Sequence, residues 1–160
     1  MRVGSGIDVH AFGPGDCVVL GGVRIAHSRG ILAHSDGDVL LHALVDALLG
    51  AAGLGDIGQH FPDTDAQWKG AKSERFVAHA MELLTRRGQR VVNADLTLVA
   101  QKPKISLWRD EIRRSIAIML RLPEAAVNLK ATTTELLGFI GRDEGLMAMA
   151  TVLIDDIKNG

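Results

Sequence analysis

Two kinds of hydrophobic periodicity alternate along the 160-residue chain. Runs in which apolar and polar residues alternate predict strands, and apolar residues spaced three or four positions apart predict amphipathic helices. Gly21-Gly22 separates two β-rich runs and predicts a hairpin, because glycine tolerates the positive φ angles of a tight turn. Besides this hairpin, which falls within residues 17–25, we expect strands at 1–13, 91–100, 127–134 and 146–157.

Three segments carry the helical periodicity. Ser35 or Asp36 can cap the start of the first helix, and Gly53 can end it. The second helix runs from a cap at Ser73 to Gly88, and the third begins at Pro103. The predicted inner faces are Leu40, Leu41, Leu44, Val45, Leu48 and Leu49 in the first helix, Phe76, Ala80, Leu83 and Leu84 in the second, and Ile105, Trp108, Ile112, Ile116 and Met119 in the third.

This order of elements predicts the α+β class. We expect a single domain over residues 1–160, with a mixed sheet and helices packed on one of its faces. The last strand is apolar on both faces, at Leu146, Met147, Met149, Val152, Leu153 and Ile154. One face can pack on helices, and burial of the other suggests a partner subunit.

Composition narrows the class of protein. Apolar residues make up 47 % of the chain but aromatic residues only 4 %, so the core is aliphatic. The 18 basic and 19 acidic residues nearly balance, which argues against a broad nucleic-acid surface. Cys17 is the one cysteine, which excludes an internal disulfide framework. No signal peptide or membrane-spanning run is present, so we expect a soluble cytoplasmic protein without a membrane partner. An organellar protein whose transit segment has been removed is the alternative.

The first strand places a carboxylate beside an imidazole. Successive strand side chains point to opposite faces, so Asp8 and His10 share one face while Ile7 and Val9 share the other. The simpler interpretation is a strand with one hydrated face. The alternative is half of a metal site, which needs a third ligand from elsewhere in the chain.

His42 is the candidate third ligand, at the edge of the first helix. Asp38 and Asp46 lie one turn away on either side and could orient its imidazole as hydrogen-bond acceptors. Two histidines and one carboxylate leave one tetrahedral position free, as a catalytic Zn²⁺ requires. The competing interpretation of His42 is a half-buried histidine with ordinary hydrogen bonds.

Other segments offer groups that suit phosphate. His34, Ser35 and Asp36 are adjacent and cannot converge as a hydrolase triad, but Ser35 at a helix start could bind an anion. At a strand end, hydroxyl groups followed by a carboxylate could bind phosphate and hydrated Mg²⁺, and the residues concerned are Thr132, Thr133, Thr134 and Glu135. These threonines are equally normal in a strand. Lys102 and Lys104 belong to a solvated loop or to a second phosphate-facing loop.

Five segments resemble one enzyme family in their order and spacing: IDVH, AHSDGDVLLHAL, LGDIGQHFPDTD, AQKPK and KATTTELLGFIGRDEG. The family is that of the 2-C-methyl-D-erythritol 2,4-cyclodiphosphate synthases, and the resemblance covers nearly the whole chain. It implies a homotrimeric lyase of the non-mevalonate route to isoprenoids, with the sheets toward the trimer interior. The implied reaction converts 4-diphosphocytidyl-2-C-methyl-D-erythritol 2-phosphate into the cyclic diphosphate and releases CMP.

The resemblance also implies roles for individual residues. Asp8, His10 and His42 would bind Zn²⁺, and Glu135 would hold a Mg²⁺ or Mn²⁺ that bridges the substrate diphosphate. His34 and Thr133 would be catalytic, with His34 positioning the substrate for the transition state. The ribose region would meet Asp56, Ile57 and Gly58, the methylerythritol end would meet Phe61, Pro62, Asp63, Thr64 and Asp65, and the cytidine would meet Ala100, Gln101, Lys102, Pro103, Lys104, Ile105 and Ser106. The remaining implied substrate contacts are Asp8, Val9, His10, Ser35, Thr132, Thr134, Phe139 and Arg142.

A possible further ligand is an isoprenoid diphosphate on the trimer axis. In the family an apolar channel there is lined by the position of Ile7 and by those of Phe139, Arg142 and Glu144. Many members carry an aromatic residue where this chain has Ile7, so the channel differs here, although Arg142 could still pair with a diphosphate.

The chemistry fits the absence of a strong protein base. The nucleophile would be the substrate's own 2-phosphate, whose second pKa is about 6 and which is mostly ionised at neutral pH. Two cations would neutralise the repulsion between this phosphate and the diphosphate. The alternatives are a metal-dependent phosphoesterase or nucleotide hydrolase, with water as the nucleophile, and a non-catalytic trimer with a structural metal.

Overall fold

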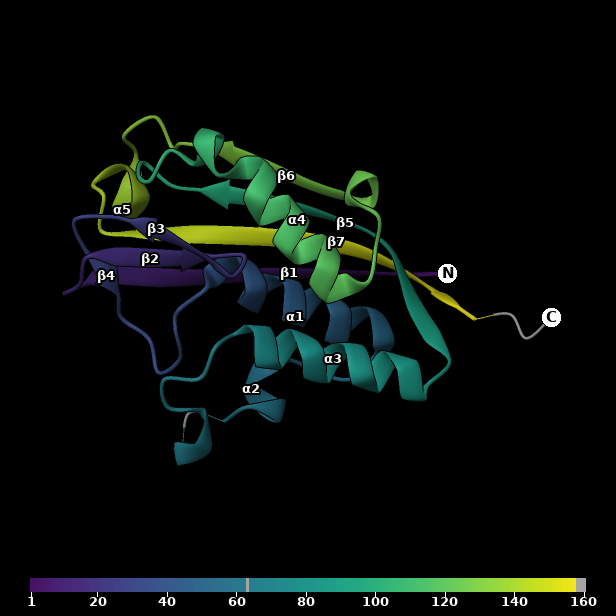
Figure 1. Ribbon diagram of the computed structural model, residues 1–160. Coiled ribbons are helices and arrows are strands. Elements are labelled where there is room, and N and C mark those ends of the chain that lie inside the picture. The colour runs from purple at the N-terminus through teal and green to yellow at the C-terminus, as the bar shows by residue number, and fades with distance from the viewer. Residues whose placement is uncertain (63, 158–160) are drawn as a thin grey trace.

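A five-stranded mixed sheet forms the centre of the computed structural model, which describes residues 1–62 and 64–157 (Figure 1). All neighbouring strands are antiparallel except the last pair, which is parallel. The strand order across the sheet is β4 (Gly30–Ile31), β1 (Arg2–Gly13), β7 (Gly145–Asp156), β5 (Gln89–Val99) and β6 (Val127–Thr132). The expected hairpin forms a separate ribbon of β2 (Cys17–Leu20) and β3 (Val23–Ala26). The α+β class and the mixed sheet are therefore confirmed.

Three longer helices pack on one face of the sheet (Figure 1). Helix α1 (Val39–Ala52) lies directly on β1 and β7, α3 (Glu74–Arg86) lies against α1, and α4 (Arg109–Leu120) contacts β6 and β3. All six leucine and valine residues predicted for the inner face of the first helix are buried. Short helices complete the chain: α2 (Ile57–His60), α5 (Gly138–Gly141), and the 3₁₀ turns η1 (Ala66–Trp68), η2 (Ile105–Leu107) and η3 (Glu124–Ala126).

Two of the three predicted helix starts were wrong. Helix α1 is capped by Asp38, not by Ser35 or Asp36, because the Asp38 carboxylate accepts the backbone N–H of Leu41 at 3.1 Å. Ser73 precedes α3 as expected, but its hydroxyl makes no capping bond. The third helix begins at Arg109 rather than Pro103, since the residues between form a loop and the turn η2. The end of α1 at Gly53, with φ of 67°, is as predicted.

Strand β1 lies unusually close to α1. A Cβ at Gly4 would sit 2.0 Å from the backbone oxygen of Ala47, and a Cβ at Gly6 would sit 2.1 Å from that of Ala43. Only glycine allows this approach, because real Cβ atoms are not found so near a carbonyl oxygen. The two glycines therefore let β1 place the next two side chains on this face, Asp8 and His10, close to the helix.

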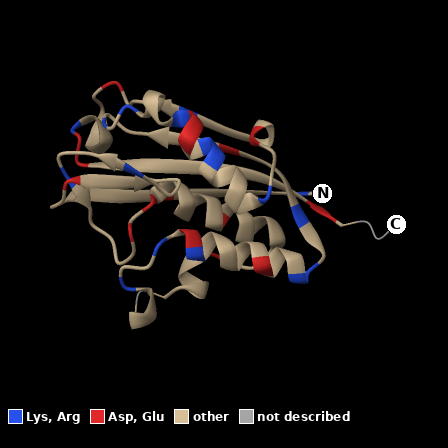
Figure 2. Cartoon of the chain, viewed as in Figure 1, with Lys and Arg blue, Asp and Glu red and all other residues tan. Residues whose placement is uncertain are grey.

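The opposite face of the sheet is open in the single chain. Apolar side chains on this face stay exposed, among them Val3, Ile7, Val9 and Met149. Strand β7 is apolar on both faces as predicted: Leu146, Val152 and Ile154 are buried, and Met147, Met149 and Leu153 lie on the open side. Figure 2 shows few charged residues along β1 and β7. Within the described residues, no helix has the length and hydropathy needed to cross a membrane.

Candidate functional site

Asp8, His10 and His42 come together as the sequence predicted. Asp8 and His10 project from the helix-facing side of β1, and His42 projects from the first turns of α1. Oδ2 of Asp8 lies 2.8 Å from Nδ1 of His10 and 3.1 Å from Nδ1 of His42. One ligand atom from each residue falls within 4.8 Å of the others, a spacing that could hold a metal ion.

The chemistry of the three groups fits a cation. Nδ1 of His10 is buried and has no hydrogen-bond partner in the described part of the chain, although it lies close to Asp8. Burial alone would raise the pKa of Asp8, but the contacts with His10 and His42 lower it to about 2. Asp8 is therefore ionised at neutral pH, and an otherwise unpaired imidazole nitrogen points at it. A group of two imidazoles and one carboxylate is typical of an open zinc site.

The second nitrogen of His42 has partners that the sequence analysis did not assign. Nε2 lies 2.9 Å from Oγ of Ser73 and 3.1 Å from Oγ of Ser35. The predicted partners Asp38 and Asp46 do not orient His42. Their carboxylates accept backbone N–H groups instead, Asp38 from the hairpin turn and Asp46 from Ile57 at 2.7 Å.

These two aspartates occupy unlike environments. Asp38 is fully buried, and burial raises its pKa to about 6 against the opposing effect of three backbone N–H donors. Burial also raises the pKa of Asp46, with its bond from Ile57 acting in the opposite direction. Both carboxylates fix the chain around α1 and do not line the metal group.

A cavity of about 560 Å³ opens over the metal group. Of the predicted contacts it is lined by Asp8, Val9, His10, His34, Ser35, Ile57, Phe61, Thr64 and Asp65. Sequence reasoning missed several further lining residues, namely Ala11, Leu32, Ala33, Ala66, Trp68, Lys69 and Phe76. The ring centroid of Phe61 lies 4.5 Å from that of Phe76 and 5.0 Å from that of Trp68, which it meets edge-on. One wall of the cavity is therefore aromatic. No local sequence pattern indicated this wall, because Phe61, Trp68 and Phe76 come from separate segments.

Some predicted contacts do not line this cavity. Asp56 caps α2 by accepting the backbone N–H of Gln59 at 3.0 Å, and Gly58 lies within that short helix. Pro62 is also outside the lining. Asp63 lies outside the described residues.

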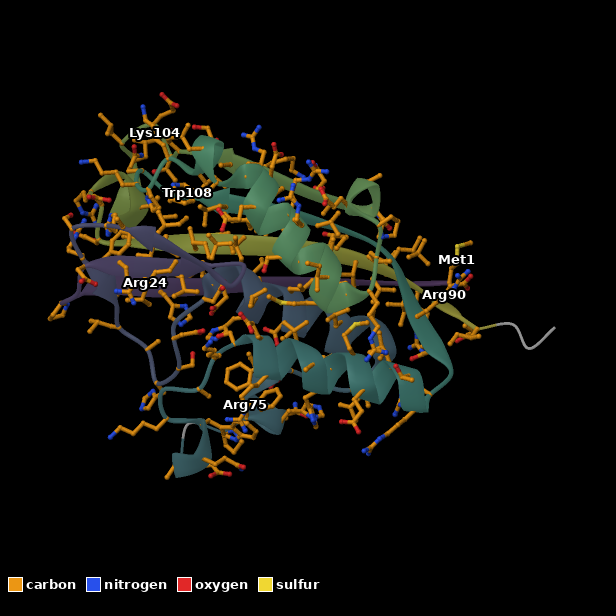
Figure 3. All side chains as sticks on the ribbon, viewed as in Figure 1. Met1, Arg24, Arg75, Arg90, Lys104 and Trp108 are labelled. Carbon is orange, nitrogen blue, oxygen red and sulfur yellow. The ribbon has the colours of Figure 1, made fainter. Side chains whose placement is uncertain are left out.

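A second cavity, of about 210 Å³, lies where β5 and β6 end. It is lined by Leu98, Ala100, Gln101, Pro103, Lys104, Ile105, Ser106, Arg109, Ala131, Thr132 and Thr133. The structure thus brings together the predicted cytidine segment and two of the threonines, while Lys102, Thr134 and Glu135 stay outside the lining. In Figure 3 Lys104 lies at one edge of the molecule and Arg75, whose guanidinium covers the Trp68 ring at 5.2 Å, lies at the other.

The two cavities share no lining residue and lie at the same level of the sheet. Val9 pairs with Met147, Met147 with Val99, and Val99 with Thr132, so one row of residues crosses from the first cavity to the second. Three strand spacings separate the ends of this row, or about 14 Å. A single chain therefore holds the two cavities apart.

The segment after β6 presents the remaining predicted residues. The hydroxyl of Thr133 donates to Oε1 of Glu135 at 3.0 Å, and Glu135 has a positive φ of 52°. Arg142 pairs with Glu144 through two bonds of 2.8 and 3.0 Å. Ile7 and Phe139 are 56 % and 41 % exposed. Apart from Thr133, none of these side chains lines either of the two cavities.

Comparisons with known proteins agree on one family. The sequence model of the YgbB family matches residues 1–155. The chain is 58 % identical over 156 residues to the 2-C-methyl-D-erythritol 2,4-cyclodiphosphate synthase of Xanthomonas campestris pv. campestris (strain B100), covering 98 % of this chain and 96 % of that protein.

Solved structures agree in fold as well as in sequence. A 2C-methyl-D-erythritol-2,4-cyclodiphosphate synthase in its CDP-bound form superposes with a TM-score of 0.89 at 42 % identity, covering 96 % of this chain and all of that one. The bifunctional IspDF of Campylobacter jejuni matches with a TM-score of 0.93 at 45 % identity over 97 % of this chain, which spans only 42 % of that larger protein. On the family match and these identities, the chain belongs to the YgbB family.

Proposed function

We propose that this chain, as one domain over residues 1–160, is a cyclodiphosphate synthase. It converts 4-diphosphocytidyl-2-C-methyl-D-erythritol 2-phosphate into 2-C-methyl-D-erythritol 2,4-cyclodiphosphate and CMP, in non-mevalonate isoprenoid biosynthesis. The observation that carries the proposal is the group of Asp8, His10 and His42 at the base of a cavity, in a chain 58 % identical to a protein of that name.

Asp8, His10 and His42 are the residues that would hold Zn²⁺, and Glu135 would hold Mg²⁺ or Mn²⁺ together with the substrate diphosphate. When bound, these cations supply neutralisation of phosphate charge and polarisation of the reacting phosphorus–oxygen bonds. The chain supplies the rest. Asp8 is already ionised, because its pKa is held at about 2, so it needs no deprotonation to receive a cation.

The first cavity would bind the methylerythritol phosphate end. His34 and Ser35 line it close to the metal group, where they can donate to phosphate oxygens. The aromatic wall of Phe61, Trp68 and Phe76 limits the access of water on one side. The substrate's own phosphate is the nucleophile, with a second pKa of about 6, so no side chain has to remove a proton from it.

The second cavity would bind the cytidine end. Ala100 and Ile105 provide buried apolar surface for a flat base, while Gln101 and Lys104 add polar groups at its edge. Thr132 and Thr133 stand at the mouth, where their hydroxyls can donate to the diphosphate. A synthase structure similar to this chain is titled as a CDP-bound form, which supports a cytidine nucleotide as the ligand.

The active form would be a homotrimer with its open sheet faces turned inward. Exposed apolar side chains on those faces, Val3, Ile7, Val9 and Met149, favour burial by partner subunits. The two cavities lie about 14 Å apart but at one level of the sheet. A rotation about an axis parallel to the strands keeps that level, so it can bring the second cavity of one subunit beside the first cavity of the next.

Two further expectations belong to this proposal. The exposed Ile7 and Phe139, with the Arg142–Glu144 pair, would border the trimer axis, where an isoprenoid diphosphate is a candidate ligand. We place the enzyme in the cytoplasm, in line with its enzyme family.

Product analysis tests the function. The purified protein is incubated with the cytidine-diphosphate substrate, with and without a chelator and then with added Zn²⁺ and Mg²⁺. We expect CMP and a cyclic diphosphate in equal amounts, and loss of both on chelation. Linear phosphate products would instead identify a metal-dependent phosphoesterase.

The metal ligands are tested with matched histidine variants. We expect Asp8→Ala and His42→Ala to lose bound metal and CMP release while keeping the fold. His79→Ala is the control, because His79 packs against His60 and Phe61 and does not belong to the metal group. Unchanged metal content in Asp8→Ala and His42→Ala would remove both as ligands.

A further inference from the structure

Ser73 and Asp36 form a chain of hydrogen bonds that ends on His42. Ser73 is fully buried at the start of α3, and its Oγ lies 2.9 Å from Nε2 of His42. The same hydroxyl donates a hydrogen bond to Oδ1 of Asp36. Oδ2 of Asp36 accepts the backbone N–H of Ser73 at 3.0 Å, which fixes the carboxylate against both groups of one residue. Three residues from three segments are thus linked in a single line.

The direction of these bonds follows from the number of protons available. An ionised carboxylate only accepts hydrogen bonds, and a serine hydroxyl has one proton to give. The Ser73 proton therefore goes to Asp36, and Oγ faces His42 with lone pairs only. For a hydrogen bond to exist over the 2.9 Å to His42, the proton must lie on Nε2.

Ser35 does not reverse this conclusion. Its Oγ lies 3.1 Å from the same nitrogen and already accepts the backbone N–H of Gly37 at 3.2 Å. If Ser35 donated to Nε2, Ser73 would face that nitrogen at 2.9 Å with no proton between them, which is repulsive. A proton on Nε2 satisfies both serine oxygens at once.

We propose that Asp36 and Ser73 are positioning residues that hold a proton on Nε2 of His42, so that Nδ1, which faces Asp8, is the nitrogen left to bind the metal. Nδ1 is the atom that lies 3.1 Å from Oδ2 of Asp8 in the metal group. In the metal-free chain Nδ1 can donate a hydrogen bond to Oδ2 of Asp8, and a bound cation would take the place of that proton. The proposal rests on the proposed function, because the metal group belongs to it, and it adds the residues that prepare His42 for the metal.

The first test reads the tautomer directly in the metal-free protein. Long-range ¹H–¹⁵N spectra of histidine-labelled protein, at mildly alkaline pH, distinguish a protonated Nε2 from a protonated Nδ1. The His42 signals are assigned by their absence from His42→Ala. We expect a protonated Nε2 in the parent, a mixture in Ser73→Ala, and mainly a proton on Nδ1 alone in Asp36→Ala, where the Ser73 proton is free to turn to His42.

The second test measures Zn²⁺ affinity by competition with a chromophoric chelator. Removing an outer hydrogen-bond partner of a histidine ligand weakens binding by about 10- to 100-fold, and we expect that loss in Ser73→Ala. Thr85→Ala is the matched control, since Thr85 lies on the same helix and its hydroxyl donates to the Met81 carbonyl at 2.8 Å. We expect the dissociation constant of that control to stay within about twofold of the parent, because its hydroxyl lies outside the metal group.

The outcomes separate this proposal from the proposed function. A parent protein in which Nε2 of His42 carries no proton overturns it, and so does a Ser73→Ala variant that binds Zn²⁺ as tightly as Thr85→Ala. A parent protein that binds no divalent cation would count against the metal centre of the proposed function. The position of the proton on His42 would still test the positioning roles of Asp36 and Ser73. If Ser73→Ala fails to fold, Asp36→Ala still tests the proposal, because the freed Ser73 hydroxyl is expected to donate to Nε2 of His42 and to leave the imidazole proton on Nδ1.

Discussion

Asp8 meets both histidines of the metal group through the same oxygen, Oδ2. Burial raises the pKa of this carboxyl, and the two imidazole contacts outweigh it and bring the pKa to about 2. Because the folded pKa lies below the ordinary value of about 3.9, Asp8 stabilises the fold above that value, and the contribution is lost as the pH falls toward 2. A cation bound in this group would contact Oδ2 of Asp8 in place of the two imidazoles.

Glu135 provides a test of the second cation. It is exposed, accepts the Thr133 hydroxyl and adjoins the second cavity, away from the zinc candidates. We expect Glu135→Gln to retain zinc but to lose the dependence of CMP release on Mg²⁺ or Mn²⁺, since an amide binds hard cations more weakly than a carboxylate. Zinc content and a Mg²⁺ titration of the rate measure the two effects. A variant that responds to Mg²⁺ as the parent does would disprove this role.

The residues that surround His42 show where sequence reasoning ends. The i, i+4 spacing of Asp38, His42 and Asp46 did place three polar side chains along one edge of α1. It could not tell that Asp38 and Asp46 would bond to backbone N–H groups of other segments. Ser73 reaches His42 from 31 positions further along the chain, and no local pattern encodes such a contact.

At the scale of elements, the contact between β1 and α1 sets the geometry of the metal group. Gly4 and Gly6 allow the strand backbone to lie against the carbonyls of Ala47 and Ala43. Ala43 adjoins His42, so any displacement of the helix there also moves the imidazole. The separation of two elements thereby determines the separation of Asp8 and His42.

Gly6→Ala tests this dependence. The added Cβ would lie 2.1 Å from the Ala43 oxygen and 2.8 Å from the Ala47 nitrogen, and backbone atoms cannot move aside as a flexible side chain does. We expect a loss of about 1–3 kcal/mol in the free energy of unfolding, by overpacking, together with weaker Zn²⁺ binding. Urea unfolding and chelator competition measure the two quantities.

Gly50→Ala is the control on the same helix. Its Cβ would meet only the Ser5 oxygen, at 3.9 Å. We expect this variant to be more stable than the parent by about 0.5–1 kcal/mol, since alanine favours a helix over glycine, with unchanged metal affinity. Equal metal affinity in both variants would show that the close approach of β1 does not control the site.

Asp38 ties the hairpin turn to the start of α1 and gives stability a pH dependence. Its carboxylate accepts the N–H groups of Gly21 and Gly22 at 2.9 and 2.7 Å. Burial raises the folded pKa to about 6, against about 3.9 in the unfolded chain, so the folded state binds the proton more readily. The contribution of Asp38 to stability therefore falls as the pH rises from about 4 to about 6, by up to about 3 kcal/mol.

The comparison with Asp38→Asn isolates this effect, because asparagine does not titrate in that range. We expect the difference in unfolding free energy between parent and variant to shift in favour of the variant as the pH rises from about 4 to about 6, and to level off above that. Urea unfolding at a series of pH values measures it. A difference that stays constant with pH would mean that Asp38 has no raised pKa.

Element types followed from the sequence better than element starts. Alternating and helical periodicities located the strands and the long helices, because burial of one face is a local pattern. The start of α1 was misplaced because Ser35 and Asp36 have capping side chains, yet Ser35 bonds to His42 and Asp36 to Ser73. Residues with capping chemistry were used for tertiary contacts, which periodicity does not reveal.

On the scale of the whole molecule, the sheet has one covered and one open face. Strand β7 is apolar on both, and the open side exposes Ile7, Val9 and Met149 of the central strands. The two cavities stand at opposite ends of one row of paired residues, about 14 Å apart. Under the proposed function, a substrate with a nucleoside at one end and a phosphorylated polyol at the other would use both cavities, and a neighbouring subunit could bring them together.

Hybrid trimers test whether neighbouring subunits share each site. One inactive variant, His42→Ala, lacks the metal half, and a second, Thr133→Val with Lys104→Glu, lacks the nucleotide half. After mixing in denaturant and refolding, some interfaces pair an intact metal half with an intact nucleotide half, so we expect CMP release to return. Sites within single subunits would stay inactive, because every chain carries a lesion. Native mass spectrometry verifies that hybrids form, and hybrids that release no CMP would rule out the shared site.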